Sequence, residues 1–194
     1  MVSTKDVKSF DDLKGLRLIA TGQMATLAEA LGATVVGMPI TDAYDAMQRG
    51  TIDGAIYGYT SSVTYGLDEV AESVWELPLG SPGGLIGMNL DVWNELPEEI
   101  QQEIENISQN IHPELYHEIY QIEGDEESIK RFEENGVKIN PATEKDAELL
   151  REIVQEVIWD TWIEQQEANG LPGRKILEDL VQFADKYAEE NPYK

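Results

Sequence analysis

Histidine and cysteine, two residue types that often carry catalysis or bind metals, are nearly absent from this chain, and the spacing of its histidines and acidic residues favours neither role. There is no cysteine, which excludes disulfides, Cys-ligated zinc and thiol catalysis. The two histidines, His112 and His117, are five residues apart and on a helix would point roughly 140° away from each other, so they would not share a metal ion. Adjacent acids such as Glu98 and Glu99 face different directions on a helix and predict a solvated surface. With no phosphate-binding glycine loop or EF-hand loop either, the sequence predicts neither an enzyme nor a cofactor site.

One stretch does have the side chains expected around a small polar ligand. Residues 57–65, YGYTSSVTY, combine three tyrosines with several hydroxyl side chains, directly after a segment with strand character. Aromatic faces and a few oriented donors are typical of pockets for small polar molecules. The same residues are equally compatible with the start of a helix, with Ser61 or Ser62 as its cap and the tyrosines packed against neighbours.

The composition excludes several classes of partner. The chain has 194 residues, of which 41% are hydrophobic, enough for one domain or two small ones. Its 14 Lys and Arg against 38 Asp and Glu give a net charge of −24, which repels nucleic acid and anionic lipid headgroups. No stretch is apolar and long enough to span a bilayer, and the first ten residues lack the apolar centre of a signal peptide. We expect no nucleic-acid partner and no signal peptide in this chain.

The elements that must position residues 57–65 alternate between strands and helices. Three short apolar runs predict strands, at residues 16–20, 34–38 and 52–56. A helix is predicted in each gap between them, and such repeats imply a parallel sheet with right-handed crossovers. Ligands of these sheets bind outside the carboxyl ends of the strands. The loops expected there are at residues 20–23, 38–41 and 57–60.

The second half of the chain is predicted to be mainly helical. Apolar residues recur every three or four positions from Ile100 to Ile122, which predicts one helix of about 40 Å with a continuous apolar side. Thr143 and Asp146 form a capping-box pattern at the start of a later helix. A last helix is predicted at residues 174–189, with its apolar side facing inward. Three more strands are predicted, at residues 72–77, 84–88 and 137–140.

Residues 38–54, MPITDAYDAMQRGTIDG, form the most specific pattern in the chain. Thr41 is a candidate N-cap for a short helix, and Gly50 predicts a left-handed residue that ends it. Gly54 lies inside the next strand, where glycine often marks the close approach of another backbone or of a ligand. A helix-to-strand unit of this kind is common in α/β proteins and alone defines no function.

The order of residues in this pattern resembles the signature of the solute-binding proteins of tripartite ATP-independent periplasmic (TRAP) transporters, the DctP-like family. Twelve positions are in register between Met38 and Gly54. Residues 10–18, FDDLKGLRL, resemble the family's strand entry, and residues 88–102, MNLDVWNELPEEIQQ, resemble its crossing into a long helix. The resemblance is continuous from Val7 to Phe132.

The resemblance implies an α/β fold: a periplasmic-binding-protein-like lobe with a mainly parallel sheet, followed by a long spine helix and C-terminal helices. Residues 1–90 would form the second of the family's two lobes with its return strand, and residues 91–194 the helices that pack on the first lobe. Most of that first lobe has no counterpart in the sequence. A fragment, a split gene that supplies a separate N-terminal lobe, and self-association that covers the exposed faces all remain open.

The implied function is the capture of a small organic solute and its delivery to TRAP membrane permease subunits, without covalent chemistry. The expected location is the periplasm or another extracytoplasmic compartment. The alternative that the residues leave open is an α/β module that oligomerises through its amphipathic helices.

The resemblance also places ligand contacts on the loops after the strands. The expected contacts are Ile19, Thr21, Gln23, Ile40, Tyr57, Tyr59 and Ser81, with Tyr57 the strongest. Most family members carry an arginine at the position of Ile19, where it binds the solute's carboxylate, and many carry an asparagine at that of Tyr57. Arg17 cannot take the place of this arginine, because alternation along the strand fixes its side chain at a position two residues before Ile19. This more apolar and aromatic site predicts a neutral ligand, or an anion held by other groups.

Overall fold

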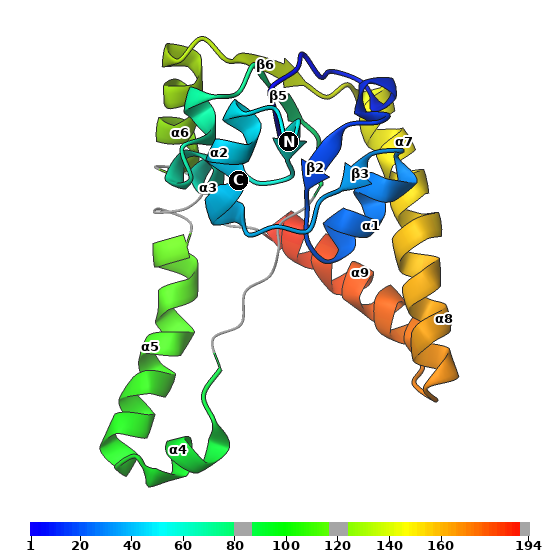
Figure 1. The fold of residues 1–194 in the computed structure, drawn as a ribbon. Coiled ribbons are helices and arrows are strands. Elements are labelled where there is room, and N and C mark those ends of the chain that lie inside the picture. Colours follow the sequence, from blue (N-terminus) through cyan, green and yellow to red (C-terminus); the bar gives the residue numbers. More distant parts are fainter. Residues whose placement is uncertain (80–86, 117–123, 191–194) are drawn as a thin grey trace.

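The computed structural model describes residues 1–79, 87–116 and 124–190, and their side chains apart from those of residues 110–116 and 187–190. In this part of the chain, a six-stranded sheet carries helices on both faces (Figure 1). The strands are β1 (Val2–Ser3), β2 (Arg17–Ile19), β3 (Thr34–Val35), β4 (Gly54–Ala55), β5 (Ser73–Glu76) and β6 (Lys138–Pro141). The helices are α1 (Gln23–Ala30), α2 (Ala43–Gln48), α3 (Tyr59–Thr64), α4 (Leu90–Glu95), α5 (Glu98–Tyr116), α6 (Gly124–Glu134), α7 (Glu144–Val154), α8 (Thr161–Ala168) and α9 (Gly173–Glu190). None of these helices is long and apolar enough to span a membrane.

The sheet is mainly parallel, as the sequence predicts. Its strand order is β3-β2-β4-β1-β5-β6, and β2 pairs in parallel with both β3 and β4. β5 and β6 are also parallel, and β1 runs antiparallel to its neighbours β4 and β5. Five strands therefore run in one direction, and their carboxyl ends lie at one edge of the sheet, called the carboxyl edge below. The opposite edge is called the amino edge.

Strand β1 is the element that the sequence pattern does not predict. Val2 and Ser3 lie at the centre of the sheet and are buried, and the Ser3 hydroxyl donates to the Asp53 carbonyl at 2.8 Å. A Cβ atom on Gly54 would lie 2.3 Å from the Val2 carbonyl oxygen. The expectation that Gly54 marks a close approach is confirmed, and what approaches is the backbone of β1.

Each face of the sheet has its own apolar core. The core on the side of α2, α3 and α6, here the α3-side core, has buried members from the strands and from α2 and α6. They are Val2, Ile19, Ala43, Ala46, Met47, Ile52, Ala55, Leu67, Val74, Phe132 and Val137. The other face packs Leu18 and Trp75 against α1, and the ring of Phe10 meets that of Trp75 edge-on at 5.0 Å. Burial on both faces stabilises the sheet, with about 1.5–3 kcal/mol for each large apolar side chain fully removed from water.

The unit at residues 38–54 folds as a helix that leads into a strand, but Thr41 does not cap it. A 3₁₀ turn at Ile40–Asp42 follows Pro39 and continues into α2. Proline fixes its own φ and so starts the turn without a side-chain cap. Gly50 has a φ of +66° after the last turn of α2, as predicted.

Two helical arms extend to the same side, below the sheet in the view of Figure 1. In the α4–α5 arm, the Gln101 amide donates to the Trp93 carbonyl at 2.8 Å and to the Leu96 carbonyl at 3.1 Å, which ties the two helices together. The predicted long helix is described as far as Tyr116, and the predicted strand at residues 84–88 lies largely outside the described residues.

The α7–α9 arm begins with the predicted capping box. The Thr143 hydroxyl accepts a hydrogen bond from the backbone N–H of Asp146, and the Asp146 carboxylate accepts one from the backbone N–H of Thr143. A π-helical segment, Gln155–Asp160, joins α7 to α8 and packs against α1. The prediction that α9 turns its apolar side inward is wrong for part of that side. Leu180 is 63% exposed and Ile176 42%, whereas Leu177 and Val181 are half-buried, because in the described structure α9 packs mainly on α8.

Candidate functional site

The carboxyl edge gathers the loops that the sequence analysis assigns to the ligand. Thr21 and Gln23 follow β2 and are exposed, and Gln23 is the first residue of α1. Ile40 begins the 3₁₀ turn after β3 and is half-buried. Tyr57 and Tyr59 follow β4, also half-buried. The topology thus brings side chains from three separate loops to one edge of the sheet.

Three of these residues share one packing surface. Ile40, Tyr57 and Tyr59 all pack against the α3-side core, and Ile19 is a buried member of that core with 1% of its surface exposed. In this structure Ile19 therefore supports the residues at the edge and exposes almost no surface of its own. Ser81 and His117 lie outside the described residues, as does the side chain of His112.

Residues 57–65 are mostly helical, as the second interpretation of that stretch expects. Helix α3 begins at Tyr59, and its N-cap is Gly58, with no side-chain capping bond. The proposed serine caps are wrong: Ser61 and Ser62 lie within the helix, and Ser62 is fully buried. Tyr57 lies in the loop before the helix, so α3 begins at the carboxyl edge with aromatic side chains beside its first turn.

Tyr59 is held in place by two contacts. Its hydroxyl donates to Glu76 Oε1 at 2.8 Å, and its ring meets that of Phe132 edge-on at 5.5 Å. Burial raises the pKa of Tyr59 well above its ordinary value, and the hydrogen bond to Glu76 and the charges of Glu76 and Asp125 raise it further. The hydroxyl therefore remains protonated and acts as a fixed donor to a carboxylate.

Glu76 is a further residue of this edge, one that the sequence patterns did not indicate as a contact. This residue ends β5 at the carboxyl edge, and alternation along the strand puts its side chain on the same face as Val74, which belongs to the α3-side core. The prediction of a strand at residues 72–77 contained the signal, since it placed Glu76 at a strand end. Nearby, the Thr60 hydroxyl pairs with Asp125 Oδ1 at 2.9 Å and joins the first turns of α3 and α6.

Asp53 of the 38–54 pattern has a structural role at the opposite, amino edge. Its carboxylate accepts from the Arg17 backbone N–H at 2.8 Å and from the Arg17 guanidinium at 3.0 and 3.1 Å, and it pairs with Lys5 at 3.0 Å. These bonds hold the pKa of Asp53 well below its ordinary value, the Arg17 side chain having the largest effect. Asp53 thus joins the segments that lead into β2 and β4, far from the loops that carry the tyrosines.

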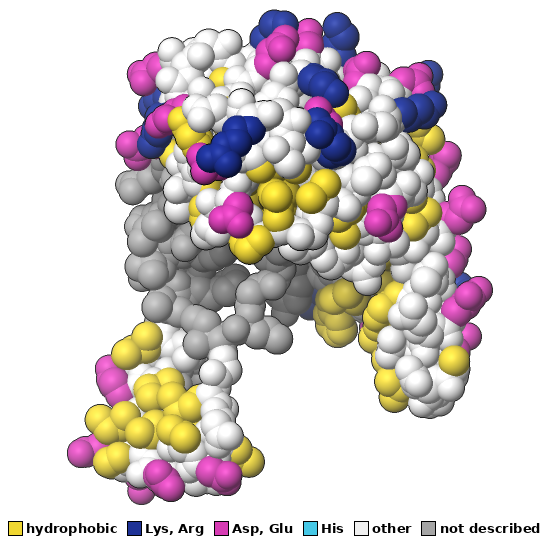
Figure 2. Space-filling view, viewed as in Figure 1, with side chains coloured by type: hydrophobic (Ala, Val, Ile, Leu, Met, Phe, Trp, Pro, Cys, Tyr) yellow, Lys and Arg dark blue, Asp and Glu magenta, His cyan; other side chains and the backbone are white. Residues whose placement is uncertain are grey.

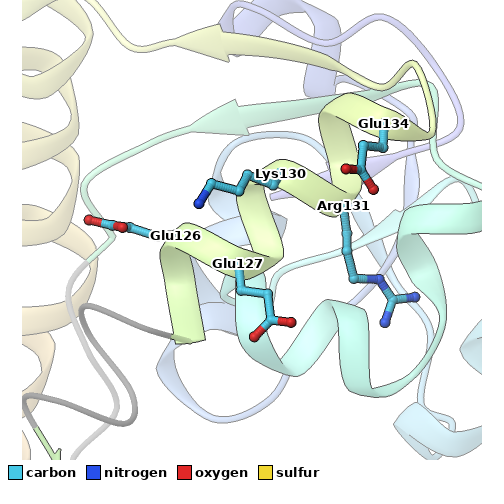
Figure 3. A pocket seen from close by; sticks show the side chains of 5 residues that line it. All are labelled: Glu126, Glu127, Lys130, Arg131 and Glu134. Atoms are coloured by element: carbon cyan, nitrogen blue, oxygen red, sulfur yellow. The ribbon is translucent and has the colours of Figure 1, made fainter.

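A hollow of about 530 Å³ on the outer side of α6 does not qualify as a site (Figure 3). Its lining residues are Glu126, Glu127, Lys130, Arg131 and Glu134. All five come from one helix, and in Figure 3 their polar ends do not converge on one point. Arg131 is engaged by buried Asp68, 3.0 Å away.

A parallel sheet with aromatic and hydroxyl side chains beyond its carboxyl edge, and helices on both faces, is the architecture of an α/β ligand-binding lobe. Residues 1–165 match the bacterial extracellular solute-binding proteins of family 7, DctP. The chain belongs to this family.

Individual relatives agree with this assignment. The monocarboxylate 2-oxoacid-binding periplasmic protein of Nostoc sp. is 34% identical over 98 residues, which are 49% of this chain and 27% of that protein. A TRAP solute-binding protein of Rhodoferax ferrireducens, solved with copurified benzoate, is 25% identical with a TM-score of 0.80, over 97% of this chain and 60% of that one. A TRAP solute-binding protein of Chromohalobacter salexigens, solved with (S)-(+)-2-amino-1-propanol, is 22% identical with a TM-score of 0.74, over 100% and 59%. The chain thus spans less than two thirds of the length of these relatives.

Proposed function

We propose that this chain forms the ligand-binding lobe and helical brace of a TRAP-type solute-binding protein that captures a small organic solute outside the cytoplasm. The observation that carries the proposal is the convergence of Ile40, Tyr57 and Tyr59 on one packing surface at the carboxyl edge, in a member of the DctP family. Such an edge is where sheets of this type bind ligands.

The solute would leave unchanged, handed on to TRAP membrane permease subunits. The support is membership of a family named for solute binding. The comparisons give no support to the alternative of a module that only oligomerises. The extracytoplasmic location is proposed on the family's description as extracellular.

We assign residues 1–90 to the ligand-binding lobe with its return strand and residues 91–194 to helices that would pack on a further lobe. Two observations support the assignment: Ile100 and Ile107 on α5 and Leu180 on α9 are exposed, and 60% of the Rhodoferax chain is matched by 97% of this one. Self-association is a poorer way to cover these surfaces. Each copy carries a net charge of −24, and its α4–α5 arm has no Lys or Arg between residues 88 and 116. Association through these arms would therefore bring like charges together.

The experiment that tests the function compares two tyrosines. Tyr57→Ala removes a side chain from the edge, and Tyr65→Ala removes one that packs on the same core from the other end of α3. A thermal-shift screen of organic acids, alcohols and amines identifies solutes that stabilise the wild type, and calorimetry gives their affinities. We expect Tyr57→Ala to weaken binding at least tenfold and Tyr65→Ala less than twofold. Equal losses in both variants would place the site elsewhere and contradict the proposal.

A further inference from the structure

We propose that the solute is a small organic cation, an ammonium group on an apolar or aromatic body, received by Glu76 together with Tyr57 and Tyr59. The inference rests on the proposed function, because it concerns the ligand of the same edge. The relatives' ligands include an acid, benzoate, and an amino alcohol, so the family alone does not set the ligand's charge. The charges of this chain's own edge must decide it.

The Lys and Arg side chains near the sheet lie mainly at its amino edge, where they pair with acids such as Asp53 and Glu72. Between Leu18 and Ile129 the sequence has one Lys or Arg, Arg49, which follows α2 on the way back to the amino edge and pairs with Asp45. In the view of Figure 2, most of the visible Lys and Arg side chains lie on the upper part of the sheet domain, away from the arms. Basic residues that begin or precede strands at the amino edge are Lys14, Arg17 and Lys138.

The loops after β2, β3, β4 and β5 therefore present no Lys or Arg in the described residues. Lys145 is the second residue of α7, beyond the end of the outermost strand β6, and so belongs to none of these loops. Asp125 and Glu76 are both close enough to Tyr59 to raise its pKa. An anionic ligand at this edge would meet like charge without a compensating cation on these loops, and like-charge juxtaposition opposes binding.

The Tyr59–Glu76 pair is built to receive a cation. Glu76 is exposed, and an ionised carboxylate can accept several hydrogen bonds, so the bond from Tyr59 leaves capacity for a ligand N–H. Phe132 fixes the ring of Tyr59, and Tyr57 adds a second aromatic ring to the same core surface. A carboxylate beside aromatic faces is a combination that binds ammonium groups, through a charge-assisted hydrogen bond and cation–π attraction.

The test uses three probes of nearly equal shape: benzylamine as the cation, benzyl alcohol as the neutral form and benzoate as the anion. Binding to the full chain is followed at pH 7.5 by chemical-shift changes of the backbone amides at residues 20–23, 36–40 and 56–60. We expect benzylamine to bind about three- to tenfold more tightly than benzyl alcohol, which is the gain that a charged hydrogen bond gives at a partly exposed site. Benzoate should bind most weakly.

Two variants that remove the same charge from the two ends of β5 give the control. Glu76→Gln keeps an acceptor for Tyr59 but removes the charge at the carboxyl edge; Glu72→Gln does the same at the amino edge, where Glu72 pairs with Lys138. We expect Glu76→Gln to erase the preference for benzylamine and leave benzyl alcohol within twofold, while Glu72→Gln changes neither.

The outcomes separate the two proposals. Tightest binding of benzoate, or a benzylamine preference that survives Glu76→Gln, would overturn the cation inference while leaving solute binding at this edge intact. Shifts confined to other regions, or none with any probe up to millimolar concentration, would overturn the proposed function and the inference with it.

Discussion

The sheet domain and the helical arms treat the same residue types in opposite ways. Phe132 of α6 has no exposed surface, whereas Phe183 of α9 is 59% exposed. Asp53 is 7% exposed and bonded to two basic side chains, whereas Asp179 of α9 pairs with Lys175 one turn away on a solvated helix. The sheet domain thus buries its large apolar side chains and pairs Asp53 internally, while the arms keep apolar surface that the described chain does not cover. A surface of that kind marks a region that packs against something else.

The largest expected difference is between the two phenylalanines. Phe132→Ala should lower the free energy of unfolding by about 3–5 kcal/mol, because it leaves a cavity in the α3-side core. Phe183→Ala should change it by less than about 0.5 kcal/mol, since the ring is already in water. Urea denaturation followed by circular dichroism measures both. Similar losses in both variants would mean that α9 is packed in solution, and would contradict the contrast between the sheet domain and the arms.

Asp53→Asn is expected to destabilise the sheet domain by about 2–3 kcal/mol, because it weakens charged hydrogen bonds to Arg17 and Lys5. This loss of stability is smaller than for a fully buried ion pair, because the side chains of Lys5 and Arg17 are partly exposed. The matched variant in the arm, Asp179→Asn, should cost less than about 0.5 kcal/mol. If both variants unfold at the wild-type urea midpoint, the cluster of Asp53, Arg17 and Lys5 at the amino edge contributes no stability.

The same cluster predicts a pH dependence. The pKa of Asp53 is lowered in the folded chain, so its contribution is fully present above its unfolded pKa near 4 and is lost as the pH falls below that value. The stability difference between the wild type and Asp53→Asn should therefore be constant from pH 7 to about pH 5 and shrink below pH 4. Urea midpoints at each pH measure it, and a difference independent of pH down to pH 3 would contradict the assignment.

A loss smaller than those of Phe132→Ala and Asp53→Asn is expected at the base of the α7–α9 arm. Thr143→Ala removes one half of the capping box and should cost about 1 kcal/mol. Thr143→Ser keeps the hydroxyl and should restore most of that stability. Hydrogen exchange of the first amides of α7 would locate the effect, and faster exchange spread evenly over α9 and the sheet would argue against a local cap.

Local features of this chain were predictable where the signal lies within a few residues. The left-handed Gly50, the close approach at Gly54 and the capping box of Thr143 and Asp146 were all found in the structure as predicted. Each depends on a backbone conformation or a bond between near neighbours, which residue type reports directly. The family assignment had the same origin, in the order of residues 38–54.

Long-range features were not predictable. Val2 and Ser3 carry little strand signal, yet their partners at residues 54–55 and 73–74 make them the centre of the sheet. Glu76 was overlooked because its partner Tyr59 is 17 residues away. The helix at residues 57–65 was one of two interpretations of that stretch. Its predicted N-caps, Ser61 and Ser62, were wrong, because the helix begins earlier and its N-cap is Gly58.

By itself, the sequence determined the mainly parallel α/β architecture, the family and the loops that follow the strands, because periodicity and turn residues act over short distances. Only the tertiary structure decided which charges share an edge, which of the predicted contacts are buried and which apolar helices lack a cover. Those properties depend on which distant segments meet, and burial and electrostatic environment are consequences of that meeting rather than of local residue order.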